Sequence, residues 1–126
     1  MVDLHRFVAY SVPAGFALLA LGALYTYLRN KDTGGWYWNL LAVVQVVLGL
    51  QVLVGAILFA TGGRPQSNGP SWLHYVYGGL FPIGVLYFAH KYARKHQGVE
   101  MLIFGVACLV AFGLTFRALQ TGLGTD

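Results

Sequence analysis

The stretch of sequence that decides the fold runs from Trp36 to Thr61 and reads WYWNLLAVVQVVLGLQVLVGAILFAT. It contains no charged residue. A helix needs about 20 consecutive apolar residues to cross the roughly 30 Å hydrocarbon layer of a membrane. The length and composition of this stretch therefore predict a transmembrane helix.

Three further apolar stretches approach the same length, at residues 7–28, 72–92 and 101–119. The connections between the four stretches are short, polar and punctuated by Gly or Pro, at residues 29–35, 62–70 and 93–98. Short connections force neighbouring helices to run antiparallel. We therefore predict an all-α fold, a four-transmembrane-helix up-down-up-down bundle, with residues 1–126 forming a single integral membrane domain.

The composition of the whole chain is typical of a membrane protein. Of its 126 residues, 57% are hydrophobic and 10% are charged, and the mean hydropathy is +0.62, a balance that a water-soluble core does not absorb. The net charge of +4 does not indicate nucleic-acid binding, because the basic residues lie between apolar stretches, where they face lipid headgroups. The first stretch is too long for a cleavable signal peptide, so we expect the first helix to be retained.

Basic residues near the ends of the predicted helices indicate an orientation. Five lie on one side of the membrane and three on the other: Arg29, Lys31, Lys91, Arg94 and Lys95 against Arg6, Arg64 and Arg117. Because basic residues concentrate on the inner side of a membrane, we expect both termini to lie outside. The compartment that this suggests is the cytoplasmic membrane of a prokaryote.

Two histidines are the strongest candidates for metal binding, because histidine commonly ligates metals and ionisable residues are costly in a membrane. His5 begins the first predicted helix and His74 begins the third. These helices run in the same direction, so both imidazoles are expected at one depth, near the outer boundary. A haem iron takes two axial ligands from opposite faces of a flat ring, which in a bundle means one imidazole from each of two helices. We predict that His5 and His74 ligate haem b; the alternative is that each is a boundary residue with a wet tip.

The faces shared with these histidines suit a porphyrin. At about 100° per residue, His5 shares its helix face with apolar side chains that include Val12 and Phe16. The face of His74 holds Gly78, Phe81, Val85 and Phe88. Gly78 and Phe81 are therefore candidates for contact with the ring. Three arginines on the outer side are candidates for bidentate hydrogen bonds to its propionates: Arg6, Arg64 and Arg117.

The remaining polar groups favour simpler interpretations. His90 and His96 stand in a strongly basic segment, where solvated side chains facing headgroups are expected and where anionic lipid or an acidic partner is the functional alternative. Gln45 and Gln51 lie inside the second predicted span, and we expect hydrogen bonds between helices from both. Gln51 has a functional alternative, contact with a bound ring. Asp3 either orients the His5 imidazole or is solvated.

Three short motifs resemble the haem A synthase family, whose members are built from two similar four-helix bundles. Leu4-His5-Arg6-Phe7 is similar to that family's His-Arg pair at the outer start of a helix, and Gln45-Val46-Val47-Leu48-Gly49 with Val54 is similar to its Gln-x-x-Leu-Gly helix. Trp72-Leu73-His74-Tyr75 is similar to the family's second haem-ligating histidine. The resemblance covers the first three predicted spans. It implies a half-size member in which His5 and His74 are axial haem ligands on the extracytoplasmic side.

The chain departs from the pattern of that family at two places. A glutamate three residues before the first histidine is implicated in the family's catalysis, and Val2 stands at that position here. The family's paired outer-loop cysteines have no counterpart, because the single cysteine, Cys108, lies within an apolar stretch. The resemblance thus leaves an enzymatic activity open. We expect a role in electron transfer or haem handling rather than an oxygenation reaction.

The sequence favours two functions over a third, a small transporter, because the spans contain no acidic residue at mid-depth and no repeat of broken helices. The first is a small membrane cytochrome b that holds one haem b and passes electrons or handles haem; it would be red. The second is a cofactor-free accessory subunit that packs its glycine-rich faces against a larger respiratory or photosynthetic membrane complex; it would be colourless. Both interpretations predict membrane lipid and a second copy or a larger membrane complex as partners, and neither identifies a redox partner.

Overall fold

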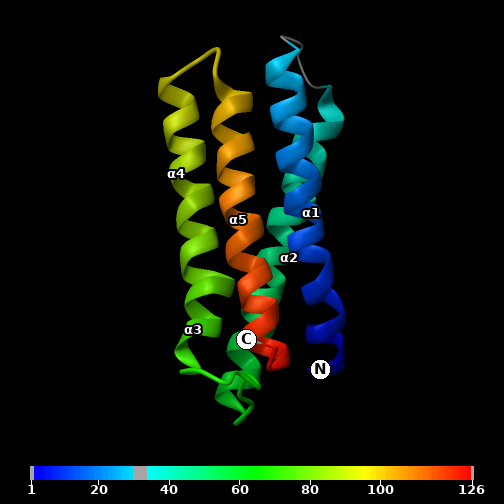
Figure 1. Cartoon of the computed structure of the whole chain (residues 1–126), viewed down its shortest axis with the longest axis vertical. Coiled ribbons are helices and arrows are strands. Elements are labelled where there is room, and N and C mark those ends of the chain that lie inside the picture. The colour runs from blue at the N-terminus through cyan, green and yellow to red at the C-terminus, as the bar shows by residue number, and fades with distance from the viewer. Residues whose placement is uncertain (1, 30–33, 126) are drawn as a thin grey trace.

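The computed structural model describes residues 2–29 and 34–125, and this part of the chain is all-helical, as the sequence predicts. Its elements are α1 (Val2–Leu28), α2 (Gly35–Ala60), α3 (Trp72–Tyr75), the π-helical segment η1 (Val76–Leu80), α4 (Phe81–Lys95) and α5 (Glu100–Leu123). Because α3, η1 and α4 follow one another without a break, the described chain forms four helical rods that lie side by side (Figure 1). Lys31, one of the cations used to predict the orientation, lies outside the described residues.

Three of the helices are individually long and apolar enough to cross a membrane, namely α1, α2 and α5. The fourth apolar stretch of the sequence, residues 72–92, is helical throughout but is divided by η1 into a short α3 and a longer α4. The chain therefore has the helices of an integral membrane protein, and one of its four rods contains an irregular turn.

Pro82 gives a physical reason for that turn. Proline lacks a backbone N–H, so a regular α-helix would leave the carbonyl of Gly78, four residues earlier, without its donor. Just before the proline, the N–H of Phe81 donates to the carbonyl of Val76, five residues back, which is the π-helical pattern. One extra residue in a turn rotates all following side chains by about 100° relative to the preceding ones.

Because of this rotation, the buried residues of α4 come one position later in the sequence than the residues predicted to share a face with His74. The buried residues of α4 are Pro82, Leu86, Ala89 and Ala93. Two of the residues expected on that face, Phe81 and Phe88, are turned outward instead and are 48% and 64% exposed. Val85 is partly buried against the core. Gly78 lies within η1 itself, four residues before Pro82.

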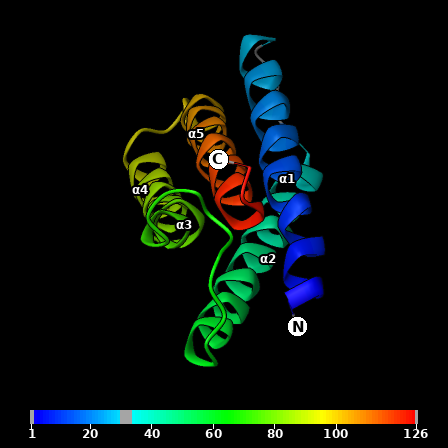
Figure 2. The same ribbon diagram turned by 60° about the horizontal axis from the view of Figure 1, so that its bottom comes forward.

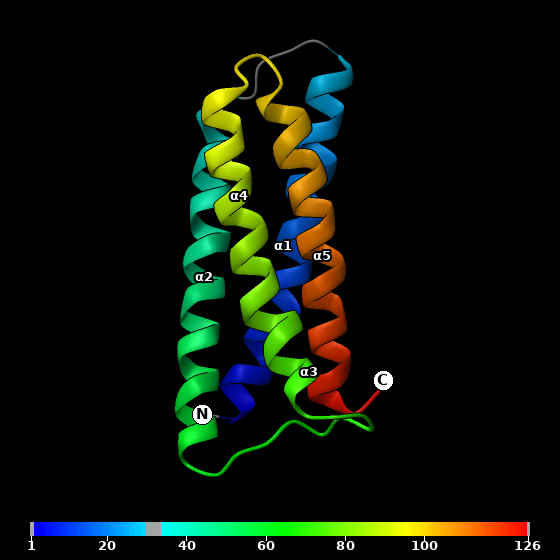
Figure 3. The same ribbon diagram turned by 90° about the vertical axis from the view of Figure 1, so that its left-hand side faces the viewer.

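The four rods do not pack equally tightly. α5 packs against both α1 and the rod formed by α3, η1 and α4, whereas α2 packs mainly on α1 (Figures 2 and 3). The core joins α1, α2 and α5 through fully buried side chains that include Phe16, Leu19, Tyr37 and Cys108. Both termini lie at the end of the molecule where α3 lies, and the connection from α4 to α5 lies at the opposite end (Figure 1). We refer to these as the α3 end and the turn end.

Candidate functional site

A cavity of about 730 Å³ lies at the α3 end, between α2 and the rod that contains α3. All four rods contribute to its wall, which is mostly apolar. This volume lies within the range of about 300–1,000 Å³ that is typical of small-molecule and cofactor sites. Its polar side chains come from α1, α2, the segment that follows α2, α3 and α5: His5, Arg6, Gln51, Arg64, His74, Tyr75 and Thr115.

The two histidines singled out in the sequence meet at this cavity. The imidazole of His5, on α1, and that of His74, on α3, have ring centroids 6.3 Å apart and planes inclined at 71°. α1 and the rod containing α3 are not neighbours in the packing, because α5 lies between them. The two rings therefore approach each other across the interior of the α3 end.

Hydrogen bonds that the His74 ring donates to α5 fix the orientation of this ring. Its Nδ1 lies 3.0 Å from the carbonyl oxygen of Ala118 and 3.2 Å from Oγ1 of Thr121. A carbonyl oxygen can only accept a hydrogen bond, so Nδ1 carries the hydrogen and donates it. In the neutral imidazole the lone pair then resides on Nε2. A backbone carbonyl bound to the second ring nitrogen is the usual support of a metal-ligating histidine.

His5 is held through its backbone rather than through its ring. Nε2 of Gln51 donates to the backbone carbonyl of His5 at 2.7 Å, which ties α2 to the start of α1. Nδ1 of the His5 ring is buried and has no hydrogen-bond partner among the described residues. Asp3, whose carboxylate was one possible partner, is exposed. A buried polar atom left without a partner is costly, so this ring nitrogen marks a place where the packed chain does not satisfy its own groups.

Glycines make room for both imidazoles. A Cβ atom added at Gly122, on α5, would lie 2.9 Å from Cε1 of His74, and one added at Gly55, on α2, would lie 3.4 Å from Cε1 of His5. A side chain at Gly122 would force the His74 ring to shift, whereas a Cβ at Gly55 would be in close contact with the His5 ring. Gly78 and Gly79 also line the cavity. Because they have no side chains, the helix that carries them does not project into the cavity at these positions.

The predicted propionate-binding arginines divide into two groups. Arg6 and Arg64 line the cavity, whereas Arg117 does not and instead donates from Nη1 to Oε1 of Gln120 at 3.3 Å. Arg64 also has a structural contact, since its Nη1 donates to the carbonyl of Phe59 at 2.9 Å near the C-terminal end of α2. Of the two predicted ring contacts, Gly78 lines the cavity and Phe81 does not.

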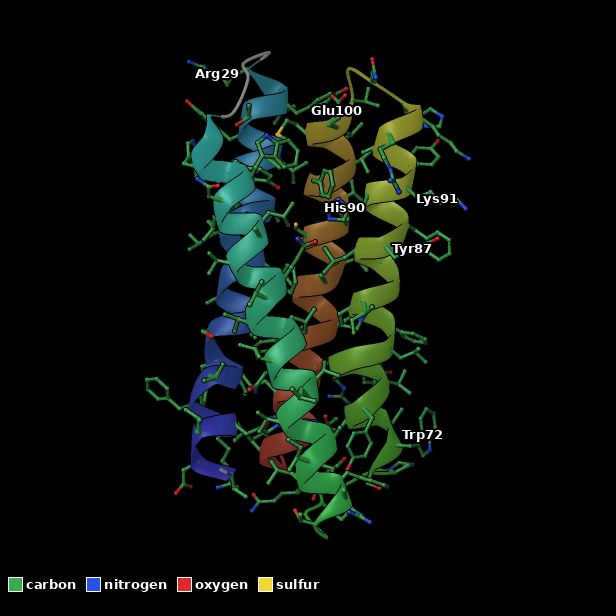
Figure 4. The ribbon with its side chains drawn as sticks, turned by 180° about the vertical axis from the view of Figure 1, so that it is seen from behind. Arg29, Trp72, Tyr87, His90, Lys91 and Glu100 are labelled. Atoms are coloured by element: carbon green, nitrogen blue, oxygen red, sulfur yellow. The ribbon has the colours of Figure 1, made fainter. Side chains whose placement is uncertain are left out.

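His90 has a different environment at the turn end. Its Nε2 donates to Oε1 of Gln45, on α2, at 2.7 Å, and its ring packs edge-on against Phe104, on α5, with centroids 4.9 Å apart. Figure 4 shows His90 pointing into the bundle while Lys91 and Tyr87 point away from it. His90 is exposed, as expected, and in addition it forms a hydrogen bond between helices. The interhelical bonds expected from Gln45 and Gln51 are both present.

Sequence reasoning missed the contribution of α5 to the site. Ala118, Thr121 and Gly122 position the His74 ring, yet the fourth predicted span offered only hydrophobicity as a signal. In contrast, Gln51 carried a usable signal, since an amide inside a span needs a partner.

The comparisons with known proteins do not assign this chain to a family: no family model, no curated protein and no solved structure matches it. In the part of the chain that the structure describes, no group of three or more His, Cys, Asp or Glu side chains converges on one point. A metal at the α3 end would therefore depend on the pair of imidazoles alone.

Proposed function

We propose that this chain is an integral membrane protein that binds one haem b between His5 and His74 and acts in electron transfer or haem handling. The observation that carries the proposal is the 6.3 Å separation of the two ring centroids. Two imidazoles that bind one metal ion through nitrogen–metal bonds of about 2 Å have ring centres about 6 Å apart. The spacing thus suits a pair of axial ligands.

The surroundings of the rings fit the same cofactor. The lone pair on Nε2 of His74 is free to bind a metal because Nδ1 is committed to Ala118 and Thr121. The cavity wall is mostly apolar, as a porphyrin requires. Arg6 and Arg64 line it and could bind the two carboxylates, Arg64 through guanidinium N–H groups other than those of Nη1, which bonds to backbone carbonyls.

Haem, when bound, supplies one-electron chemistry at its iron. The chain's own part would be to hold the ring, to exclude water from it with apolar walls, and to occupy both axial positions with imidazole. Two protein ligands favour electron transfer or haem carriage over oxygen chemistry. Val2, where the haem A synthase family has a glutamate, supports the same choice.

We propose, on the three short motifs, that the chain is a half-size relative of haem A synthases. We further propose that all four rods cross the membrane in alternating directions, with both termini outside. At 1.5 Å per residue, residues 72–95 extend for roughly 36 Å, enough to span the hydrocarbon layer. The excess of basic residues at the turn end supports this orientation.

Absorption spectra of the detergent-purified protein test the haem assignment. We expect a b-type α-band after dithionite reduction in the wild type and its loss in His5→Ala and His74→Ala. His90→Ala is the matched control, because it removes an imidazole that is already bonded within the packed turn end, and it should keep the wild-type spectrum.

Two outcomes of this measurement would contradict the proposal. Wild-type α-bands in both His5→Ala and His74→Ala would remove the ligand assignment. A colourless wild-type protein, expressed with haem available and folded by circular dichroism, would favour the cofactor-free accessory subunit.

A further inference from the structure

A second concave surface lies at the turn end, between α4 and α5 on the outside of the bundle. This groove has a volume of about 570 Å³, and we refer to it as the α4–α5 groove. Its floor includes two small buried residues, Ala89 on α4 and Ala107 on α5, which are 5% and 7% exposed. Its walls include larger exposed side chains of both helices: Phe88, Tyr92, Val106 and Val110. The groove exists because small residues face each other between large ones.

Two cations line this otherwise apolar groove. Lys91 and Lys95 are one helical turn apart on α4 and both belong to its lining. Lys91 projects away from the bundle (Figure 4). No carboxylate lines the groove, and Glu100, the nearest in sequence, accepts the backbone N–H of Gly98 at 3.0 Å with both of its oxygens.

The wall that carries the lysines is held in place by a ring contact. The rings of Tyr92 and His96 stack with centroids 3.9 Å apart and planes inclined at 15°. Tyr92 lies between the two lysines in sequence. Its contact with His96 therefore supports the part of the groove wall that carries Lys91 and Lys95.

We propose that the α4–α5 groove binds an anionic phospholipid, with an acyl chain between the apolar walls and the phosphate at Lys91 and Lys95. α5 is long and apolar enough to cross a membrane, so the groove lies where acyl chains surround the protein. A soluble anion would leave the apolar walls unused, and a zwitterionic lipid, which has no net charge, would compensate neither lysine, whereas an anionic phospholipid compensates one of them. The groove lies at the opposite end from the histidine cavity, and this inference does not depend on haem binding.

Native mass spectrometry of the full chain in detergent, with equal amounts of phosphatidylglycerol and phosphatidylcholine of identical acyl chains, tests the charge requirement. We expect the wild type to retain one phosphatidylglycerol in preference. Each of Lys91→Gln and Lys95→Gln should weaken this binding about fivefold, and the double variant about 30-fold, since a basic residue near an anionic lipid contributes about 1 kcal/mol. Arg94→Gln is the matched control, because Arg94 lies between the lysines but not in the groove.

A pair of tryptophan variants tests the groove itself. Val106→Trp should fill the groove from its exposed rim and abolish retention of phosphatidylglycerol while leaving both lysines in place. Leu109→Trp adds the same side chain at an exposed position of α5 outside the groove and should retain the lipid. Circular dichroism establishes that both variants are folded.

Two results would overturn the proposal. Equal weakening by Arg94→Gln and Lys95→Gln would reduce the effect to general surface charge. Equal retention by the two tryptophan variants would show that lipid contacts only the basic segment and not the groove. If Val106→Trp does not fold, the comparison of the lysine variants with Arg94→Gln still decides, and the haem spectra of the same samples remain a separate readout.

Discussion

The two ends of the bundle differ in how the space between the helices is filled. At the turn end, Tyr37 is fully buried and packs edge-on against Trp38, whose ring in turn contacts Phe104. His90, which points toward the bundle at this end, is bonded to Gln45. At the α3 end, glycines replace the large side chains, a cavity remains, and two imidazoles face it. The same residue type is structural where aromatic rings fill the space and chemically available where glycines leave it open.

The largest effect is expected at the filled end. Tyr37→Ala removes the largest fully buried side chain and should lower the free energy of unfolding by about 3–5 kcal/mol, the usual cost of an aromatic cavity. Tyr37→Phe keeps the ring and removes a buried hydroxyl that has no hydrogen-bond partner among the described residues, so it should leave the free energy of unfolding nearly unchanged. Denaturant titration in detergent measures both. Equal losses in the two variants would show that the hydroxyl, rather than the packing, holds the turn end together.

The second effect concerns the open end. Gly122→Ala places a Cβ atom 2.9 Å from Cε1 of His74, and such overpacking costs about 1–3 kcal/mol. If this cost falls on haem binding, the affinity for haem should fall by a factor between about 5 and 150, and the haem-to-protein ratio of the purified variant should fall with it. Gly113→Ala, on the same helix with no atom within 4 Å of the added Cβ, should leave the ratio unchanged. A wild-type ratio in Gly122→Ala would show that this glycine is not part of the site.

How far the sequence predicts the molecule depends on helix regularity. Apolar length was enough to predict the helices, and depth alone was enough to pair His5 with His74, because both arguments hold for any helix. Phe81 failed as a lining residue because the π-helical turn before Pro82 rotates it outward. A proline indicates an irregular turn, yet whether the helix bends or gains a residue depends on the packing of its neighbours.

The sequence also did not predict which side chains from different helices contact each other. His90 is exposed, as its basic neighbours in sequence indicate, but its hydrogen bond to Gln45 on another helix could not be read from those neighbours. Arg117 was grouped with Arg6 and Arg64 by depth, but depth does not specify the direction in which a side chain leaves its helix. Depth and composition are properties of one helix, whereas a site belongs to several.

The smallest effects come from one substitution made at both ends. Gln45→Leu and Gln51→Leu each remove one hydrogen bond between helices, to His90 and to the backbone of His5 respectively. Each should destabilise the protein by about 0.6 kcal/mol, the average for such bonds in membrane proteins. Only Gln51→Leu should alter the haem spectrum, because only its partner lines the cavity. Identical spectra for the two variants would argue that the position of α1 is set without this bond.

We propose that His5 and His74 would together hold one haem b at the α3 end. Electron paramagnetic resonance of the oxidised, detergent-purified protein tests it most directly. Two imidazole ligands with planes inclined near the observed 71° predict a low-spin ferric signal of high anisotropy, with one haem per chain. A high-spin signal, or a low-spin signal that persists in the His5→Ala/His74→Ala double variant, would contradict the account.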